Sequence, residues 1–342
     1  MRRSVCLLLA AAFCVCFAAC AAPVKPEASR TVPFTDDAGR TVELPADITR
    51  VAPSGAVAKL VMTVLAPEQL VSLNAPYAEA QEDFVPEAVR SLPVTGQLFG
   101  GKSNLNLESL LSAAPQIILD LGDLRSDTAE TLDDLQTRTG IPVVFLCADL
   151  DHMAQTLRTL GSLLSGKRER GAALAAYTEK TLQTAEALAG KIPDSERKTV
   201  LFLAGTEGLG VNPAGSSNAQ VIERIGAVNA AVMDSFVSKD GGNLIDTEQL
   251  FLFDPDVLVY SPQSVFAENP DPAWKNLRAV QEGRCFEIPA EPYSWLSNPP
   301  SVNLLPGIWW LAEKVYPEYC EFDLNAVLRE YFELFWGNTK HQ

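Results

Sequence analysis

Two segments in different halves of the chain share one spacing of residues, and this repeat limits the folds that the sequence can adopt. Residues 107–119 read LESLLSAAPQIIL, and residues 247–259 read TEQLFLFDPDVLV. In both segments a leucine lies two residues after the glutamate, and a proline lies seven residues after it. Each segment is typical of a helix that ends at a proline and leads into a buried strand. The repeat therefore predicts two lobes of similar construction.

Around these segments, short apolar runs alternate with helical patterns, which is typical of parallel sheets covered by helices on both faces. We expect strands at residues 50–53, 69–73, 116–121, 142–147 and 199–203, and helices at residues 56–65, 107–114 and 128–139. Residues 31–45 form two alternating runs around the turn sequence DDAG, which predicts a hairpin. Residues 151–191 carry a long helical pattern with no proline before Pro193.

The chain has 342 residues, which is too long for one typical core. We therefore predict an α/β protein with two Rossmann-like lobes built on parallel sheets, at residues 31–150 and 193–342. One long spine helix at residues 151–192 would join them, and a ligand cleft would lie between the lobes.

The N-terminus is typical of an exported protein. Arg2 and Arg3 precede an uncharged apolar run at residues 5–19, which is shorter than the ~20 residues of a transmembrane helix. The run ends in Phe-Ala-Ala-Cys, which resembles a bacterial lipobox with Cys20 as the lipidated residue. Residues 1–20 would then be a lipoprotein signal peptide and residues 21–30 a tether. The alternative is plain signal-peptidase cleavage near Ala22.

Charge, histidines and cysteines exclude several classes of protein. A formal net charge of −16 is unsuited to binding nucleic acid through its phosphates. His152 and His341 are the only histidines, too few for the imidazole clusters with which receptors bind bare zinc or manganese. Cys147, Cys285 and Cys320 remain after the signal, and their spacing indicates no zinc site. A bridge between the last two and free thiols both stay open.

No catalytic motif is present. The sequence has no GxSxG elbow, Walker A loop or HExxH, and the GLG of residues 208–210 lacks the third glycine of a dinucleotide site. We therefore expect a protein that is not an enzyme and carries no cofactor.

Ligands of α/β lobes meet the loops at the carboxyl ends of the strands. Aromatic side chains in such loops offer large flat surfaces that suit macrocycles, catecholates or haem. These loops nominate ten cleft residues, which are Ser54, Gly55, Gln97, Phe99, Asp123, Thr206, Glu207, Ser261, Tyr293 and Trp295.

The order of several segments resembles the periplasmic binding proteins for iron complexes, haem and vitamin B12. The segments that carry this resemblance are the hairpin at residues 34–40, the two glutamate repeats, residues 208–230, and the PYSW and PPSVN sequences at residues 292–295 and 299–303. In part of that family the asparagine of the last segment is followed by arginine, whereas here Leu304 follows Asn303.

The resemblance implies a monomeric, extracytoplasmic substrate-binding lipoprotein of an ABC importer. Glu108 and Glu248, one in each lobe, would form salt bridges with the permease dimer, which works with its ATPase, while the lipid on Cys20 holds the protein at the membrane. The expected ligand is an iron complex, such as a ferric siderophore, haem or a related chelate. The alternatives are a corrinoid, an oxyanion such as molybdate or tungstate, or, as a different class, an adhesive or scaffold lipoprotein.

Overall fold

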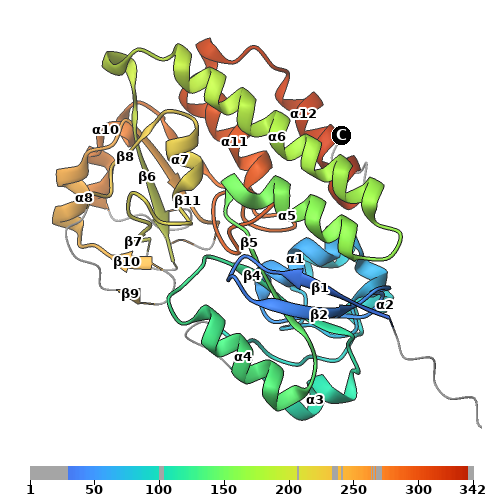
Figure 1. Cartoon of the computed structure of the whole chain (residues 1–342). Helices are drawn as coiled ribbons and strands as arrows, with labels where there is room; N and C mark the ends of the chain where they lie inside the picture. The colour runs from blue at the N-terminus through green and yellow to red at the C-terminus, as the bar shows by residue number, and fades with distance from the viewer. Residues whose placement is uncertain are drawn as a thin grey trace, which may run out of the picture.

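The computed structural model describes residues 30–99, 104–205, 208–232, 238–239, 242–262, 264, 266 and 272–337. Figure 1 shows two α/β lobes below a group of helices, and the long helix α6 (Arg168–Lys191) runs above both lobes. This arrangement confirms the predicted α/β class with two lobes.

The N-terminal lobe is built on a parallel sheet in the order β3-β4-β5. The strands are β3 (Val51–Pro53), β4 (Ile117–Gly122) and β5 (Val143–Cys147). Alternate residues of β4 belong to two separate cores, one on each face of the sheet, which explains why the strand is apolar except for Asp120. A hairpin of β1 (Thr31–Thr35) and β2 (Thr41–Pro45) precedes the sheet, as the turn sequence predicts.

Three helices of the N-terminal lobe form where the periodicity predicts them, and these are α1 (Ala56–Leu65), α3 (Leu107–Ser112) and α4 (Thr128–Thr139). The short helix α2 (Glu87–Arg90) and the 3-10 turns η1 (Pro67–Gln69) and η2 (Glu79–Phe84) were not predicted. The strand predicted at residues 69–73 is wrong. The turn η1 occupies its start, and Leu70 and Leu73 make only single bridges, to Val51 and Val94.

The C-terminal lobe has a mixed sheet, in the order β12-β11-β6-β7-β10-β9. Strands β6 (Thr199–Ala204), β8 (Val228–Asn229), β11 (Val257–Tyr260) and β12 (Cys285–Glu287) pair in parallel. Strands β7 (Gly210–Val211), β9 (Ser238–Lys239) and β10 (Gly242–Leu244) extend the sheet in antiparallel pairs. The prediction of a wholly parallel sheet is therefore corrected for this lobe, because short chain reversals add antiparallel strands at one edge. The helical segments of the lobe are η3 (Asp194–Glu196), α7 (Gln220–Arg224), α8 (Thr247–Phe253), η4 (Pro272–Asn276) and α10 (Arg278–Gln281).

The segment predicted as one spine helix, residues 151–192, forms two helices, and that detail is corrected. Helix α5 (Leu150–Leu163) ends, Gly166 adopts φ of +69°, and the chain reverses into α6. The two helices pack so closely that a Cβ on Gly171 would lie 2.8 Å from the Cα of Gly161. An ion pair of 2.5 Å between Arg158 and Glu179 fixes the same antiparallel pairing. The predicted spine is therefore an antiparallel pair of helices, of which α6 is the longer.

The last helices tie the two lobes into one core. Helices α11 (Leu304–Val315) and α12 (Leu324–Trp336) follow the second lobe, with η5 (Pro317–Tyr319) between them, and both pack on α6. Helix α12 also reaches the first lobe, where the ring of Phe84 lies 5.7 Å from that of Trp336. Trp309 and Trp310 are buried in α11.

The sequence repeat has a structural counterpart in α3 and α8. The side chains of Asn106 and Asp246 cap the two helices by accepting hydrogen bonds from the backbone N–H of Ser109 and Gln249. Each helix is followed by a non-glycine residue with positive φ directly before the proline, Ala114 (47°) and Asp254 (31°). The two segments therefore share a side-chain cap and an unusual exit, as expected of repeated units, although α8 is one residue longer than α3.

Candidate ligand-binding cleft

Six of the ten predicted cleft residues line a single cavity of about 550 Å³. Five come from the first lobe and one from the second, and they are Ser54, Gly55, Gln97, Phe99, Asp123 and Tyr293. The first-lobe residues follow strands β3 and β4 or lie in the loop after Val94. The expectation that ligands bind at loops beyond the carboxyl ends of strands therefore located the cavity. Asn298, Pro299 and Pro300 close it from the second lobe.

A buried carboxyl group forms part of the cavity wall. Asp120 in β4 is 6% exposed, and its Oδ1 accepts a short hydrogen bond from the hydroxyl of Ser54. Burial raises the pKa of the Asp120 carboxyl, while the Ser54 hydrogen bond and the charge of Arg125 lower it. The cavity therefore contains an acid that is easier to protonate than an exposed aspartate.

A cation lies over an aromatic ring at the same cavity. The guanidinium carbon of Arg125 is 3.8 Å from the centroid of Phe99, which is within the range of a cation–π contact. Asp127 lies 3.5 Å from Nε of Arg125 and is exposed. Stacking on Phe99 holds a flat, permanently charged donor group at the cavity, where it can bind an anionic ligand.

Tyr293 lines the cavity, but its hydroxyl is buried away from it. The residue is 8% exposed, and its hydroxyl has almost no accessible surface and makes no hydrogen bond to any residue in the described part of the chain. Burial raises the pKa of this hydroxyl, and the neighbouring Tyr77 and Tyr331 raise it further. Tyr293 is therefore a neutral side chain of the cavity wall.

Asn303 has a structural role next to this site. Its Nδ2 donates hydrogen bonds to the carbonyl oxygens of Ser294 (2.5 Å) and Ser297 (3.0 Å). The asparagine of the PPSVN segment thus holds the turn that carries Tyr293.

Asp123 connects the two lobes. Its Oδ2 accepts a 2.6 Å hydrogen bond from the hydroxyl of Ser217, which precedes α7 in the second lobe. An ion pair of 2.6 Å between Arg224 and Asp151 crosses the same boundary. Both contacts lie beside a further hollow of about 700 Å³ lined mainly by polar residues.

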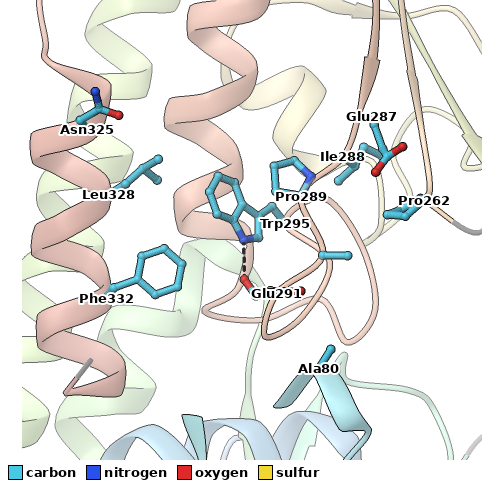
Figure 2. Close-up of a pocket in the computed structure, with 11 residues that line it drawn as sticks. Ala80, Pro262, Glu287, Ile288, Pro289, Glu291, Trp295, Asn325, Leu328 and Phe332 are labelled. Atoms are coloured by element: carbon cyan, nitrogen blue, oxygen red, sulfur yellow. Dashed lines mark hydrogen bonds between the residues drawn. The ribbon is translucent and has the colours of Figure 1, made fainter. Parts of the chain in front are cut away.

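Trp295 lies in a different cavity from Tyr293. Figure 2 shows this cavity, of about 700 Å³, between α12, the loop after β12 and Ala80 of the first lobe. The indole Nε1 of Trp295 donates a 3.1 Å hydrogen bond to the carbonyl oxygen of Glu291. Ser261 lines neither cavity, although the next residue, Pro262, lines the one around Trp295.

The remaining predictions fall outside the described residues or away from the cleft. Thr206, Glu207 and Cys20 lie outside the described residues. His152 is an exposed residue of the first turn of α5, where its ring bonds to the cap residue Asp149. Cys147, Cys285 and Cys320 are unpaired thiols.

Among the cavity residues that the sequence did not nominate, two are charged. Asp120 is a charged residue in an otherwise apolar strand, and this contrast was a usable signal. Arg125 lies two residues beyond Asp123 in the same loop. Including a few more residues after the end of β4 among the candidates would have found it.

Residues 67–292 match the family described as Periplasmic binding protein, and this range covers most of the chain. The chain belongs to the periplasmic binding protein family. The match confirms the resemblance drawn from the sequence, and it makes the protein an extracytoplasmic solute-binding protein of an ABC transporter. In the described part of the chain, none of the helices is both long and apolar enough to span a membrane.

Individual relatives bind different solutes. An ABC transporter solute binding protein from Sulfurospirillum deleyianum is 26% identical with a TM-score of 0.80, over 91% of this chain and 96% of that one. The molybdate-binding protein MolA of Haemophilus influenzae is 22% identical over 70% of this chain and 72% of its own. The Fe(3+)-citrate-binding protein YfmC of Bacillus subtilis is 24% identical over 55% of this chain and 58% of its own. Family membership thus leaves the solute of this chain to be argued from its cleft.

Proposed function

We propose that this protein captures an anionic iron chelate in the cavity between its lobes and delivers it to an ABC permease. The observation that carries the proposal is Arg125 stacked on Phe99 at a cavity that residues of both lobes line. A ferric complex with carboxylate, hydroxamate or catecholate groups presents both negative charge and acceptor oxygens. It would meet the guanidinium by charge-assisted hydrogen bonds.

The size of the cavity supports a chelate of moderate size. A volume of about 550 Å³ lies within the range of about 300–1,000 Å³ found for small-molecule sites. The net charge of −16 does not oppose an anionic ligand, because a local cation in a low-dielectric cleft outweighs distant screened charges. The likeness to the ferric citrate-binding protein YfmC agrees with this class of ligand.

An oxyanion such as molybdate is the second candidate, and the likeness to MolA favours it. Such an ion is small and would leave most of the cavity unfilled. The two candidates therefore make different demands on the aromatic wall, which only a larger chelate would contact.

Tryptophan fluorescence of the domain that starts after residue 20 tests the proposal. We would titrate it with ferric citrate, a ferric hydroxamate, haemin, cobalamin and molybdate. Saturable sub-micromolar binding of an iron complex that weakens in Arg125→Gln supports the proposal. Binding of molybdate alone replaces it with the oxyanion role. A folded protein that binds none of the panel contradicts both.

We further propose that the protein is a receptor and not an enzyme. The absence of nucleophile and metal-protease motifs from the sequence supports this. Mass spectrometry of a bound ligand after prolonged incubation and release should return the same compound. A recovered fragment or reduced complex would contradict it.

Membrane attachment through a lipid on Cys20 is part of the same proposal. The basic residues, apolar run and Phe-Ala-Ala-Cys sequence at the N-terminus support it. Metabolic labelling with a palmitate analogue should mark the wild-type protein and leave Cys20→Ser unlabelled. Labelling of both would contradict it.

Docking of Glu108 and Glu248 onto the permease completes the proposal. Both glutamates are exposed, and each is the second residue of its helix, α3 and α8. Two acids fixed by rigid lobes would orient the protein on a dimeric membrane partner. Charge-removing variants at either position should lower permease affinity and leave ligand binding unchanged.

A further inference from the structure

The cavity between the lobes contains a carboxyl group with one unpaired oxygen. Asp120 lines the cavity and is 6% exposed. Its Oδ1 accepts the hydrogen bond from the Ser54 hydroxyl, whereas its Oδ2 accepts none from any residue that the structure describes. Buried polar atoms usually bond to protein, water or a ligand. Oδ2 is therefore the oxygen of Asp120 that remains for a ligand in this cavity.

Arg125 offsets the charge of this carboxyl only in part. It lines the same cavity, and its charge lowers the pKa of the Asp120 carboxyl, but burial raises that pKa by more. The guanidinium is also shared with other groups, since it stacks on Phe99 and lies 3.5 Å from Asp127. An ionised Asp120 is therefore poorly compensated in the ligand-free protein.

The elements packed around Asp120 supply little further compensation. Strands β3 and β5 flank β4 without a charged side chain, and the thiol of Cys147 in β5 stays neutral because burial raises its pKa. Helix α1 packs on β4 with Lys59 as its charged residue, and this ammonium donates to two backbone carbonyl oxygens. Of the remaining titratable groups that line the cavity, Tyr293 is neutral and Asp123 is an exposed acid.

An anionic ligand shifts this balance further against the charged form of Asp120. Its negative charge competes for Arg125 and adds a like charge beside the carboxyl, and both effects favour protonation. A protonated Asp120 avoids the repulsion, and its O–H can donate a hydrogen bond to an oxygen of the ligand. Protonation of this one group therefore removes a charge from the cavity and supplies a donor to the ligand.

We propose that Asp120 takes up one proton when an anionic ligand binds and donates the new O–H to an oxygen of that ligand. The proton comes from the solvent, and no other bond of the protein changes. The inference rests on the proposed function and makes Asp120 a specificity-determining residue, because a ligand without an acceptor oxygen at this place would leave the buried O–H unpaired.

Proton uptake makes the affinity depend on pH in a defined direction. The pKa of Asp120 is higher in the complex than in the free protein, so the complex binds more protons than its separated parts. The affinity should therefore rise as the pH falls between these two pKa values, by up to about tenfold per pH unit.

Calorimetric titration in two buffers of different ionisation enthalpy counts the protons that are taken up. The domain that starts after residue 20 would be titrated with ferric citrate, and with molybdate as a second anion, from about pH 5 to 8. Protons that belong to the probe contribute equally to both proteins, so the wild type should take up more than Asp120→Asn, by up to about one proton. Asparagine keeps the shape and offers an N–H donor, so this variant should bind at least as tightly as the wild type and with a flatter pH profile.

Two further variants keep the test independent of that substitution. Asp123→Asn removes the exposed acid of the same cavity and should keep the proton uptake. Ser54→Ala removes the hydrogen bond that favours the charged carboxyl, so it raises the pKa of Asp120 in the free protein and should move the range of uptake to higher pH. Thermal unfolding shows whether each variant is folded.

Equal proton uptake by the wild type and Asp120→Asn at every pH would overturn the inference and leave the proposed function standing. Uptake that persists in Asp120→Asn and disappears in Asp123→Asn would assign the proton to Asp123 and also contradict it. A folded wild-type protein that binds no anionic probe would contradict the proposed function and, with it, the inference.

Discussion

Lys59 is a buried lysine next to the cleft, and its replacement tests the packing of the first lobe. It lies on α1, one turn beyond the residues that line the cavity, and is 5% exposed. Its Nζ donates hydrogen bonds to the carbonyl oxygens of Ala75 (3.1 Å) and Pro76 (3.3 Å) and lies 4.4 Å from the ring of Tyr77. Burial lowers the pKa of Lys59 from 10.5 to about 8.

The fall in pKa sets the size and the pH range of the effect. Because of this lowered pKa, burying the charged Lys59 in the folded state costs about 3 kcal/mol of stability. The full penalty applies below about pH 8, where Lys59 is charged in the folded and the unfolded state. Between about pH 8 and 10.5 the unfolded chain binds more protons than the folded one, so this penalty fades as the pH rises. Lys59→Met removes this penalty but also two hydrogen bonds from a charged donor, worth about 1.5–3 kcal/mol each. We therefore expect the variant to be at most as stable as the wild type at pH 7, and up to about 3 kcal/mol less stable.

Urea unfolding of both proteins at several pH values measures the effect. The stability of Lys59→Met relative to the wild type should fall between about pH 8 and 10.5 and then level off, because the wild type gains stability over this range. Lys180→Met, which removes a lysine whose side chain is 54% exposed, serves as the control and should show no such trend. A stability difference at Lys59 that does not change with pH would refute the reasoning.

Three further predictions concern the cleft and the repeat. Arg125→Gln should weaken binding of an anionic chelate about 10- to 100-fold, measured by calorimetry. Arg125→Lys should bind more tightly than Arg125→Gln but more weakly than the wild type, because lysine keeps the charge but not the planar donor. Wild-type affinity in both variants would contradict this. Asp120→Asn should bind the ligand with less pH dependence on the acidic side than the wild type, since burial raises the pKa of the Asp120 carboxyl; unchanged pH profiles would contradict it. Ala114→Gly should raise the free energy of unfolding by up to about 1 kcal/mol, because Ala114 has a strained φ of +47° that glycine adopts freely. The control Ala113→Gly should lower the free energy of unfolding, because Ala113 has an ordinary φ of −70°. A lower free energy of unfolding in both variants would argue against strain at Ala114.

Periodicity alone predicted much of the fold. The bounds of α1 and α4 agree with the sequence pattern, because each amphipathic run ends at a change of composition. The hairpin and the buried strands β4 and β5 also agree within a residue or two. Strong local signals and tertiary packing favour the same structure at these places.

Features that depend on contacts distant in sequence were not predictable. The reversal between α5 and α6 needs the close approach of Gly161 and Gly171, which a helical pattern does not reveal. The antiparallel strands β7, β9 and β10 are two or three residues long, too short to show alternation. Tyr293 and Trp295 are two residues apart in the chain, yet they line different cavities because the turn between them directs their side chains differently.

The position of the cleft could be predicted from the sequence, but the chemical groups that it offers to a ligand could not. The strand-end rule brought together Ser54, Gln97 and Asp123 because parallel strands present their carboxyl ends at one edge. It could not show that Arg125 stacks on Phe99 or that Tyr293 keeps a buried hydroxyl without a partner, since both depend on how loops from two lobes meet.

The position of iron in a crystal of the complex tests the central claim most directly. Data collected above and below the iron absorption edge, on the soluble domain grown with ferric citrate or a ferric hydroxamate, would locate the metal without assumptions about the ligand. We expect one anomalous peak inside the cavity beside Arg125 and Phe99, with ligand oxygens near the guanidinium. A peak in the cavity around Trp295, or an empty cleft at saturating concentrations of every chelate tried, would contradict it.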